Sequence, residues 1–282
     1  MENPKVQIVV PVYNAAEYLR KCLDSIKNQT YTNWEAILID DASKDNSRDI
    51  IREYAESDNR FVYVPLEKNG GVSRARNHAL SLLTGDYAAF LDSDDYWEED
   101  MLMTMVTKIR EADFDVVQCR FIYDFPGGRT VLPSGAFKCD TILRGKSLKK
   151  VYIRMMTGIN MNHVCMKLIR TSLIKNLRFD TGLKTAEDLK LCVDLFKSVK
   201  TYAFIDKPMY HYRRSEQSLT GKGLSGKQKL YANRKVAVHM ADALKDWGIN
   251  NLFYKTLCYL RPYIIIVSKI FRIAREKIVE KK

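Results

Sequence analysis

Aliphatic runs and helical patterns alternate along the first half of the chain. Continuous apolar runs, which are typical of strands buried on both faces, predict strands at 6–10, 36–39, 61–64, 87–91 and 116–121. Between the first two runs, apolar side chains recur at Leu19, Cys22 and Ile26, the spacing of one helical face. Strands that alternate with helices predict an α/β fold with a mostly parallel central sheet, covered by helices on both faces.

The second half of the chain is less regular. Its turns and apolar segments predict a hairpin region at 127–135, a strand at 164–169, a helix at 187–200 and extended segments at 203–205 and 210–213. Beyond Gly226 the pattern is helical, and Pro262 is expected to begin or kink a terminal helix. We therefore expect a main α/β domain at 1–220 and a basic, amphipathic helical extension at 221–282.

The composition is that of an ordinary globular protein, with 46% hydrophobic and 28% charged residues. The six cysteines are scattered without a C-x-x-C pair, so neither a zinc site nor a disulfide framework is expected. The first residues lack the basic start and apolar core of a signal peptide, and no apolar run approaches the length of a membrane span. These features favour reduced thiols and a cytoplasmic protein that does not cross a membrane.

The formal net charge of +12 is unevenly distributed. Residues 245–282 hold nine Lys or Arg against three Asp or Glu, which is half of the excess. Such asymmetry predicts a basic surface element with an acidic partner, either anionic membrane lipid or nucleic acid. The alternative is a helix that covers its own domain or forms an oligomer contact. Nucleic acid has little other support, because no known nucleic-acid-binding module is present.

Polar clusters follow the expected strands at the point where each strand ends, which is where ligands gather in parallel sheets. After the fourth strand, Asp92, Asp94 and Asp95 place three carboxylates within four positions, and these repel one another unless a cation or a donor is present. Mg²⁺ and Mn²⁺ prefer such oxygen ligands. The simpler interpretation of an isolated D-x-D is an acidic turn that caps the helix beginning near Asp100.

Three further clusters carry possible chemistry. Asp41 ends the second strand, where a carboxylate can accept a hydrogen bond from a base or a ribose. A glycine turn at 70–71 leads into a helix with Arg76, which suits a diphosphate. Glu187 and Asp188 begin another helix, where acidic residues are also favourable simply because of the helix dipole.

Together these clusters resemble glycosyltransferase family 2. The resemblance rests on motifs in the family's order and spacing: Pro11-Val12-Tyr13-Asn14, Asp40-Asp41-Ala42-Ser43, Gly71-Val72-Ser73-Arg74-Ala75-Arg76-Asn77, Gly85-Asp86-Tyr87 and Leu91-Asp92-Ser93-Asp94-Asp95. It covers about the first hundred residues and continues more weakly to Glu187-Asp188 and to the segment 210–213.

The resemblance implies a GT-A fold, with 1–220 as the catalytic domain, and an inverting, Mn²⁺- or Mg²⁺-dependent transfer of a hexosyl or N-acetylhexosaminyl group. By the same likeness, Asp188 is the catalytic base, Glu187 supports it or binds the acceptor, and Asp94 holds the metal. Asp95 is a further candidate in the acidic cluster, and His211 could approach the diphosphate or the metal, although a histidine among tyrosines is more often a packing residue. The implied donor-binding residues are Pro11, Tyr13, Asp41, Arg76, Asp92 and Ser93.

The family's usual chemistry implies a nucleotide-sugar donor with uridine as the base, and a glycan or lipid-linked acceptor in cell-surface polysaccharide or glycoconjugate synthesis. Two alternatives from other classes remain. A sugar-phosphate nucleotidyltransferase would release pyrophosphate instead of a nucleoside diphosphate, and its glycine-rich basic signature is absent near the N-terminus. A binding protein with the same fold and no catalysis is disfavoured by the presence of Asp41, Asp92, Asp94 and Asp188.

Overall fold

The computed structural model describes residues 3–158, 160–214 and 224–264. Its strands are β1 Val6–Val12, β2 Trp34–Asp40, β3 Phe61–Pro65, β4 Tyr87–Phe90, β5 Tyr96–Trp97, β6 Val116–Asp124, β7 Thr130–Val131, β8 Thr141–Arg144, β9 Lys167–Arg170 and β10 Thr201–Arg213. Its α-helices are α1 Ala16–Lys27, α2 Ser47–Ser57, α3 Val72–Leu82, α4 Met101–Ala112, α5 Lys149–Thr157, α6 Thr171–Ile174, α7 Glu187–Phe196 and α8 Gly226–Ala243. The five strands predicted in the first half of the chain are confirmed, each within three residues at either end.

One sheet runs through the molecule in the order β3-β2-β1-β4-β9-β6-β10-β5. Strands β3, β2, β1, β4, β6 and β10 point the same way, and β9 and β5 run against them. The predicted mostly parallel central sheet is therefore confirmed. Because the parallel strands share a direction, their carboxyl ends meet along one edge of the sheet.

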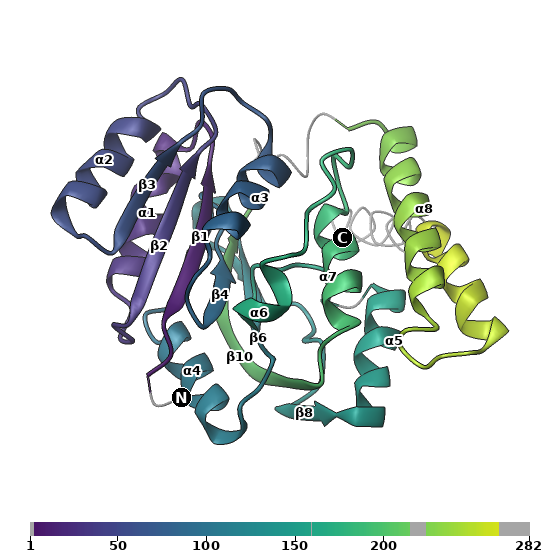
Figure 1. Cartoon of the computed structure of the whole chain (residues 1–282). Helices are drawn as coiled ribbons and strands as arrows, with labels where there is room; N and C mark the ends of the chain where they lie inside the picture. Colours follow the sequence, from purple (N-terminus) through teal and green to yellow (C-terminus); the bar gives the residue numbers. More distant parts are fainter. Residues whose placement is uncertain (1–2, 159, 215–223, 265–282) are drawn as a thin grey trace, which may run out of the picture.

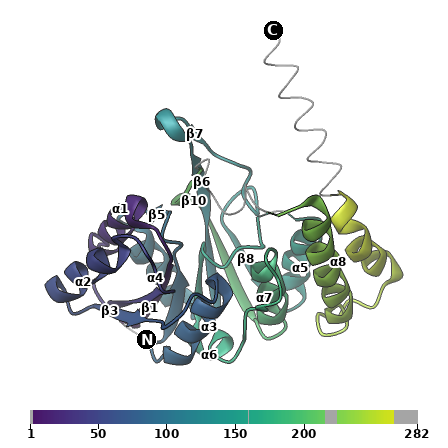
Figure 2. The same cartoon turned by 90° about the horizontal axis from the view of Figure 1, so that it is seen from above.

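Helices cover both faces of this sheet (Figures 1 and 2). Helices α1 and α2 pack on each other on one face of the N-terminal strands, while α3 packs against β1 and β2 from the other face. All seven residues of β1 are buried, as expected of a strand with helices on both sides. Toward the C-terminus, α7 packs against α5 and α8.

The two extended segments predicted at 203–205 and 210–213 are one long strand. β10 pairs with β6 over most of its length, and the register shifts on either side of Pro208. Proline has no backbone N–H to donate to the neighbouring strand, so the strand passes through an irregularity there instead of ending. The predicted hairpin region contains β7, which pairs with the end of β6.

The chain continues as α8 and as a helical segment at 252–264. The predicted domain boundary at 220/221 lies outside the described residues, so the division into two parts stays a prediction. Pro262 lies inside the described helical segment 252–264, so it does not begin a helix there, and most of the basic terminal helix predicted after it lies outside the described residues. Among the described residues, none of the helices has the length and hydropathy needed to cross a membrane. All six cysteines are free thiols.

Candidate active site

Several of the predicted site residues lie on loops that leave the common edge of the sheet. Tyr13 follows β1, Asp41 follows β2 and Asp92 follows β4. Pro11 is buried in β1, whereas Tyr13 is 44% exposed beyond the strand's end. The fold therefore places the N-terminal motifs in neighbouring loops, because β2, β1 and β4 are neighbours in the sheet.

The backbone is strained at three of these positions. Asn14, Ala42 and Ala186 have positive φ angles of 48°, 59° and 63°, a region that non-glycine residues avoid. Asn14 directly follows Tyr13, Ala42 follows Asp41, and Ala186 precedes Glu187. Such conformations cost roughly 1–3 kcal/mol each where the side chain does not tolerate them. Two further non-glycine residues, Asp113 and Asn160, also have positive φ angles, so this feature occurs in the site loops and elsewhere among the described residues.

Asp41 holds the glycine turn in place. Its two carboxylate oxygens accept hydrogen bonds from the backbone N–H groups of Gly70 at 2.8 Å and Gly71 at 2.7 Å. Gly71 has a φ of 83°, which a glycine adopts without cost, and α3 begins at the next residue. This contact orients the first turn of α3 and thereby the direction in which Arg76 points.

One buried arginine gathers three carboxylates. The side chain of Arg76 is 4% exposed. Its Nη2 donates to Asp92 Oδ1 at 2.6 Å, its Nη1 donates to Asp188 Oδ1 at 2.8 Å, and Glu187 Oε1 lies 3.6 Å from Nη1. Four predicted site residues, separated by up to 112 positions in the chain, therefore form a single cluster. We call these residues the Arg76 cluster.

The Arg76 cluster carries more negative than positive charge. Burial, together with the neighbouring charge of Asp188, raises the pKa of Glu187 to about 7. Beside the cluster, burial and the charge of Asp92 raise the pKa of Asp94 to about 6. The acidic side chains here thus outnumber the basic ones, and an added cation would reduce the repulsion between them.

Two carboxylates of the acidic loop after β4, Asp94 and Asp95, have different surroundings. Asp95 is buried and accepts hydrogen bonds from the Tyr210 hydroxyl at 2.5 Å and the Arg213 N–H at 2.8 Å, so it ties this loop to the end of β10. Asp94 forms no ion pair with any basic side chain in the described part of the chain. A half-buried carboxylate with a raised pKa and no paired cation fits a divalent ion that takes its other ligands from phosphate and water. Ser93 lies half-buried between Asp92 and Asp94.

Within the described ranges, no group of three or more His, Cys, Asp or Glu side chains is arranged to hold a metal ion. His211 lies on β10 between two acidic side chains outside the Arg76 cluster, Asp124 and Glu98. Its Nδ1 is 3.1 Å from Asp124 Oδ2, its Nε2 is 2.7 Å from Glu98 Oε1, and its ring stacks on Tyr96 at 4.3 Å. The structure therefore shows His211 bridging two acidic side chains, and among the described residues no hydrogen bond or ion pair joins it to the Arg76 cluster.

The loop between α5 and β9 reaches the Arg76 cluster from the other side. The N–H of Val164 donates to Asp188 Oδ2 at 3.3 Å, and the Cys165 thiol donates to Asp92 Oδ2 at 3.5 Å. The loop is held by Lys167, a fully buried lysine whose Nζ donates to the carbonyls of Met161 and His163. These bonds fix the part of the loop that contacts Asp92 and Asp188.

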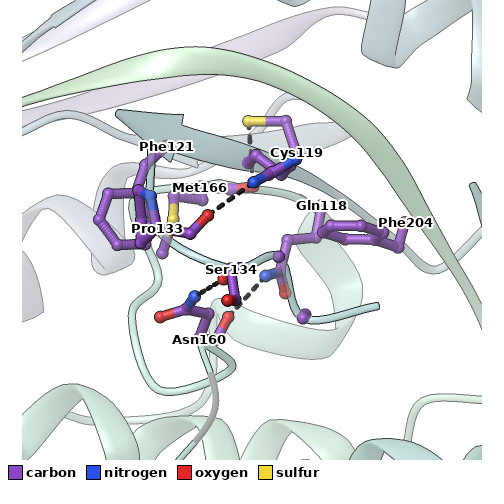
Figure 3. A pocket seen from close by; sticks show the side chains of 11 residues that line it. Gln118, Cys119, Phe121, Pro133, Ser134, Asn160, Met166 and Phe204 are labelled. Atoms are coloured by element: carbon purple, nitrogen blue, oxygen red, sulfur yellow. Dashed lines mark hydrogen bonds between the residues drawn. The ribbon is translucent and has the colours of Figure 1, made fainter. Parts of the chain in front are cut away.

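Figure 3 shows the narrow crevice where this loop begins. Gln118 Nε2, on β6, donates to the backbone carbonyl of Asn160 at 2.7 Å, and the Asn160 amide donates to the Ser134 carbonyl. Both ends of the loop are therefore fastened to the sheet, one through Gln118 and the other through Lys167. A loop fixed in this way can hold its contacts to the site with little reorganisation.

A cavity of about 230 Å³ opens beside Asp92. It is lined by Asp92, Phe121, Tyr123, His163, Cys165, Met166, Tyr210, Tyr212 and Arg214. The Arg214 guanidinium lies over the rings of Tyr123 at 5.0 Å and Tyr212 at 5.7 Å. The cavity is thus an aromatic-walled space whose lining includes one cation, Arg214, and one residue of the Arg76 cluster, Asp92.

Most of the cavity wall was not predicted from the sequence. Tyr123 and Arg214 belong to no motif that names a role, and Cys165 looks like any buried cysteine. The one available signal was position, because Tyr123 and Arg214 lie at the carboxyl ends of β6 and β10, at the edge where Asp41 and Asp92 also lie. Parallel pairing of β6 and β10 could not be read from the chain, so this signal was of no use without the fold.

Comparison with known proteins gives a family match over most of the chain. Residues 7–178 match the model of "Glycosyl transferase family 2". The chain is 35% identical over 229 residues to "Glycosyltransferase GlyA" of Streptococcus pneumoniae, an alignment that covers 77% of this chain and 32% of the relative. It is 32% identical over 235 residues to "Minor teichoic acid biosynthesis protein GgaB" of Bacillus subtilis, covering 82% of this chain and 25% of the relative. The chain thus spans a third or less of the length of these two relatives.

Among solved structures, the chain is similar to that of S. aureus TarS, residues 1–349, in complex with UDP-GlcNAc. The TM-score is 0.71 at 24% identity, and the alignment covers 86% of this chain and 71% of the other. This similarity shows the fold alone, and it confirms the GT-A fold expected from the sequence.

Proposed function

The chain belongs to glycosyl transferase family 2, and from this premise we propose that it moves a sugar from a nucleotide-diphosphate sugar to an acceptor hydroxyl with inversion at the anomeric carbon. The observation that carries the proposal is the Arg76 cluster, in which Asp92 and Asp188 share one buried cation beside an aromatic-walled cavity. The sugar of the donor must meet both a catalytic base and the acceptor hydroxyl. We therefore place the reacting atoms between the carboxylates of the Arg76 cluster and the aromatic-walled cavity.

The loops after β1, β2 and β4 form the donor side of the site. Tyr13 is exposed there and offers a ring to a nucleobase, and the glycine turn at Gly70–Gly71 is held by Asp41. Both Asp41 oxygens already accept backbone N–H groups, so its first role is to shape this pocket. Uridine as the base is supported by the UDP-GlcNAc bound to the similar TarS structure.

Asp188 is the proposed base. Its Oδ1 is held by Arg76, while Oδ2 accepts, from the described part of the chain, one long hydrogen bond of 3.3 Å from the N–H of Val164. Asp188 does not itself line the cavity, but Val164 lies between His163 and Cys165, which do, and Oδ2 is therefore the proposed oxygen that takes the proton of an acceptor hydroxyl. Glu187, with its pKa near 7, carries a proton in part of the molecules at neutral pH and moderates the charge around Asp188.

Asp94 is the proposed ligand for Mg²⁺ or Mn²⁺. A bound ion of this kind offsets the charge that develops on a departing diphosphate. Asp95 does not compete for this role, since Tyr210 and Arg213 occupy its oxygens. Its proposed part is to hold Asp94 in position by tying the loop to β10.

The aromatic-walled cavity is the proposed acceptor site. It lies on the β6 and β10 side of Asp92, away from β1 and β2, which carry the donor motifs. Tyr123 and Tyr212 meet edge to face at a centroid distance of 5.6 Å and form a rigid wall against which a sugar ring can pack. GgaB, a relative by sequence, is named for teichoic acid biosynthesis, which supports an acceptor in cell-surface polymer synthesis.

The test is a screen of nucleotide sugars with Mn²⁺ or Mg²⁺, with and without EDTA, that measures nucleoside diphosphate release and donor binding by calorimetry. We expect metal-dependent turnover of one donor. Asp94→Asn should remove the metal dependence of donor binding, and Asp188→Asn should abolish transfer while donor binding persists. Asp49→Asn, at an acid whose side chain is 73% exposed on α2, is the matched control and should change neither.

The other outcomes decide between the alternatives. Release of pyrophosphate would identify a nucleotidyltransferase. Tight donor binding without turnover of any acceptor, unchanged in Asp188→Asn, would favour a binding protein. Transfer with retained anomeric configuration, measured by NMR of the product, would contradict a single displacement with Asp188 as base.

A further inference from the structure

The helical segment at 252–264 has two faces of different character. One face, with Leu257, Cys258 and Arg261, packs against the rest of the protein. On the opposite face lie six exposed apolar residues, with exposed Thr256 among them: Leu252, Phe253, Tyr259, Leu260, Tyr263 and Ile264. At about 100° per residue these six side chains span about 140° of the helix surface. We call them the apolar face.

The exposure of the apolar face is large. Leu252 is 79% exposed and Phe253 is 67% exposed, and the other four side chains are between 42% and 49% exposed. Single exposed apolar residues are ordinary, but six on one helix face form a cluster of the kind that marks a binding surface. Within the described residues, the loops around the candidate active site contribute nothing to this patch.

The helix that carries the apolar face is joined to α5 and α8 by its buried side. Arg261, on the opposite side of the same helix, is 3% exposed and pairs with no carboxylate in the described part of the chain. Its Nε donates to the carbonyl of Met155 in α5 at 3.3 Å, and its Nη1 donates to Asn233 Oδ1 in α8 at 3.2 Å. Figure 1 shows this segment in yellow beside α8 and α5, at the far end of the molecule from α1 and α2. Anything that binds the apolar face is therefore oriented with respect to the whole domain.

The charge of the described C-terminal part indicates which partner fits. Residues 224–264 carry seven Lys or Arg against two Asp or Glu, a net charge of +5 in a chain whose net charge is +12. Lys255 is exposed on the helical segment itself. A second copy of the same surface would bring like charges together, and nucleic acid offers no apolar layer for Leu252 or Phe253. An anionic lipid bilayer offers both negative headgroups and an apolar layer.

We propose that the apolar face docks on an anionic lipid surface, with its aliphatic and aromatic side chains inserted at the boundary of headgroups and acyl chains. Arg261 then acts as the link that sets the orientation of the domain on the membrane. Its carbonyl partner lies in α5, which leads through Gly158 toward the loop that contacts Asp92 and Asp188. Docking would thus place the candidate acceptor side at a fixed orientation to a membrane-bound substrate.

The test is co-sedimentation of the full chain with vesicles of phosphatidylglycerol and phosphatidylcholine, compared with vesicles of phosphatidylcholine alone. Phe253→Glu/Leu260→Glu should weaken binding to the anionic vesicles at least about 30-fold, since each added charge near such a surface costs about a factor of 5 and apolar insertion is lost as well. The control variant Leu132→Glu/Ile142→Glu changes the charge equally, at two apolar residues elsewhere on the surface that are 47% and 51% exposed. Its affinity for the anionic vesicles should fall much less.

Equal losses in the two double variants would mean that net charge alone attracts the protein, and the proposal would be wrong. Failure of the unaltered chain to bind anionic vesicles would also overturn it. Light scattering measures the oligomeric state. A dimer that Phe253→Glu/Leu260→Glu converts to a monomer would show that a second copy covers the apolar face, which would also contradict the proposal. None of these measurements depends on transferase activity, so their outcome is independent of the proposed function.

Discussion

Removal of Arg76 is the sharpest perturbation of the site that the structure offers. In Arg76→Met, a side chain of similar length replaces the cation, and Asp92, Glu187 and Asp188 lose their shared partner. Breaking a buried ion pair from one side typically costs about 3–5 kcal/mol. The three carboxylates are between 14% and 31% exposed, so water offsets part of this cost. We expect Arg76→Met to lower the free energy of unfolding by about 3 kcal/mol at pH 8, near the lower end of that range.

The loss should depend on pH in a defined direction. Without the cation, the carboxyl groups of the folded chain hold protons more tightly than those of the unfolded chain, so protonation favours folding as the pH falls. The pKa of Glu187 is already near 7 with Arg76 present, so its protonation at pH 5.5 relieves much of the repulsion. We therefore expect a clearly smaller loss of stability at pH 5.5 than at pH 8.

Urea unfolding of the full chain at both pH values measures this effect. With a slope of about 3 kcal/mol/M, the midpoint should move by about 1 M at pH 8. Arg20→Met is the matched control, because Arg20 and Glu53 form an ion pair at 2.7 Å with both side chains more than half exposed, and its midpoint should not move. Equal losses for Arg76→Met at the two pH values would refute the account of the site as a charge cluster.

Three further predictions concern the same site. Glu187→Gln should stabilise the chain above about pH 7 and not below about pH 5. The raised pKa of Glu187 makes the folded state lose stability as the pH rises from about 4.5 through about 7, and glutamine removes this loss. Urea unfolding at pH 5 and pH 8 measures the difference. Asp94→Asn should lower the affinity for Mn²⁺-dependent donor binding at least about tenfold in calorimetry, and an unchanged metal response would exclude Asp94 as the ligand. Tyr123→Leu should raise the KM for the acceptor while donor affinity stays unchanged, since Tyr123 lines only the acceptor cavity; a matching loss of donor affinity would contradict that assignment.

Several features of the fold follow from local patterns in the chain. The buried strands β1 and β2 appear as aliphatic runs because helices cover both faces of the sheet. The loops after β1, β2 and β4 were recognisable because polar clusters follow those runs directly. The extended segments predicted at 203–205 and 210–213 are confirmed, but local patterns did not show that they form one strand, because the pairing with β6 that continues across Pro208 comes from residues far away in the chain.

The sequence by itself determined the family, the layered α/β architecture and the identity of the acidic residues, since each depends on residue types at short spacing. Only the tertiary structure decided how those residues work together. Arg76 joins Asp92 to Asp188 across 112 positions, and the aromatic cavity requires β6 and β10 to lie side by side. The raised pKa of Glu187 likewise arises from burial and from the charge of Asp188 beside it. Long-range contacts, burial and shared charge are properties of the packed chain, because they depend on which distant segments come together and exclude water.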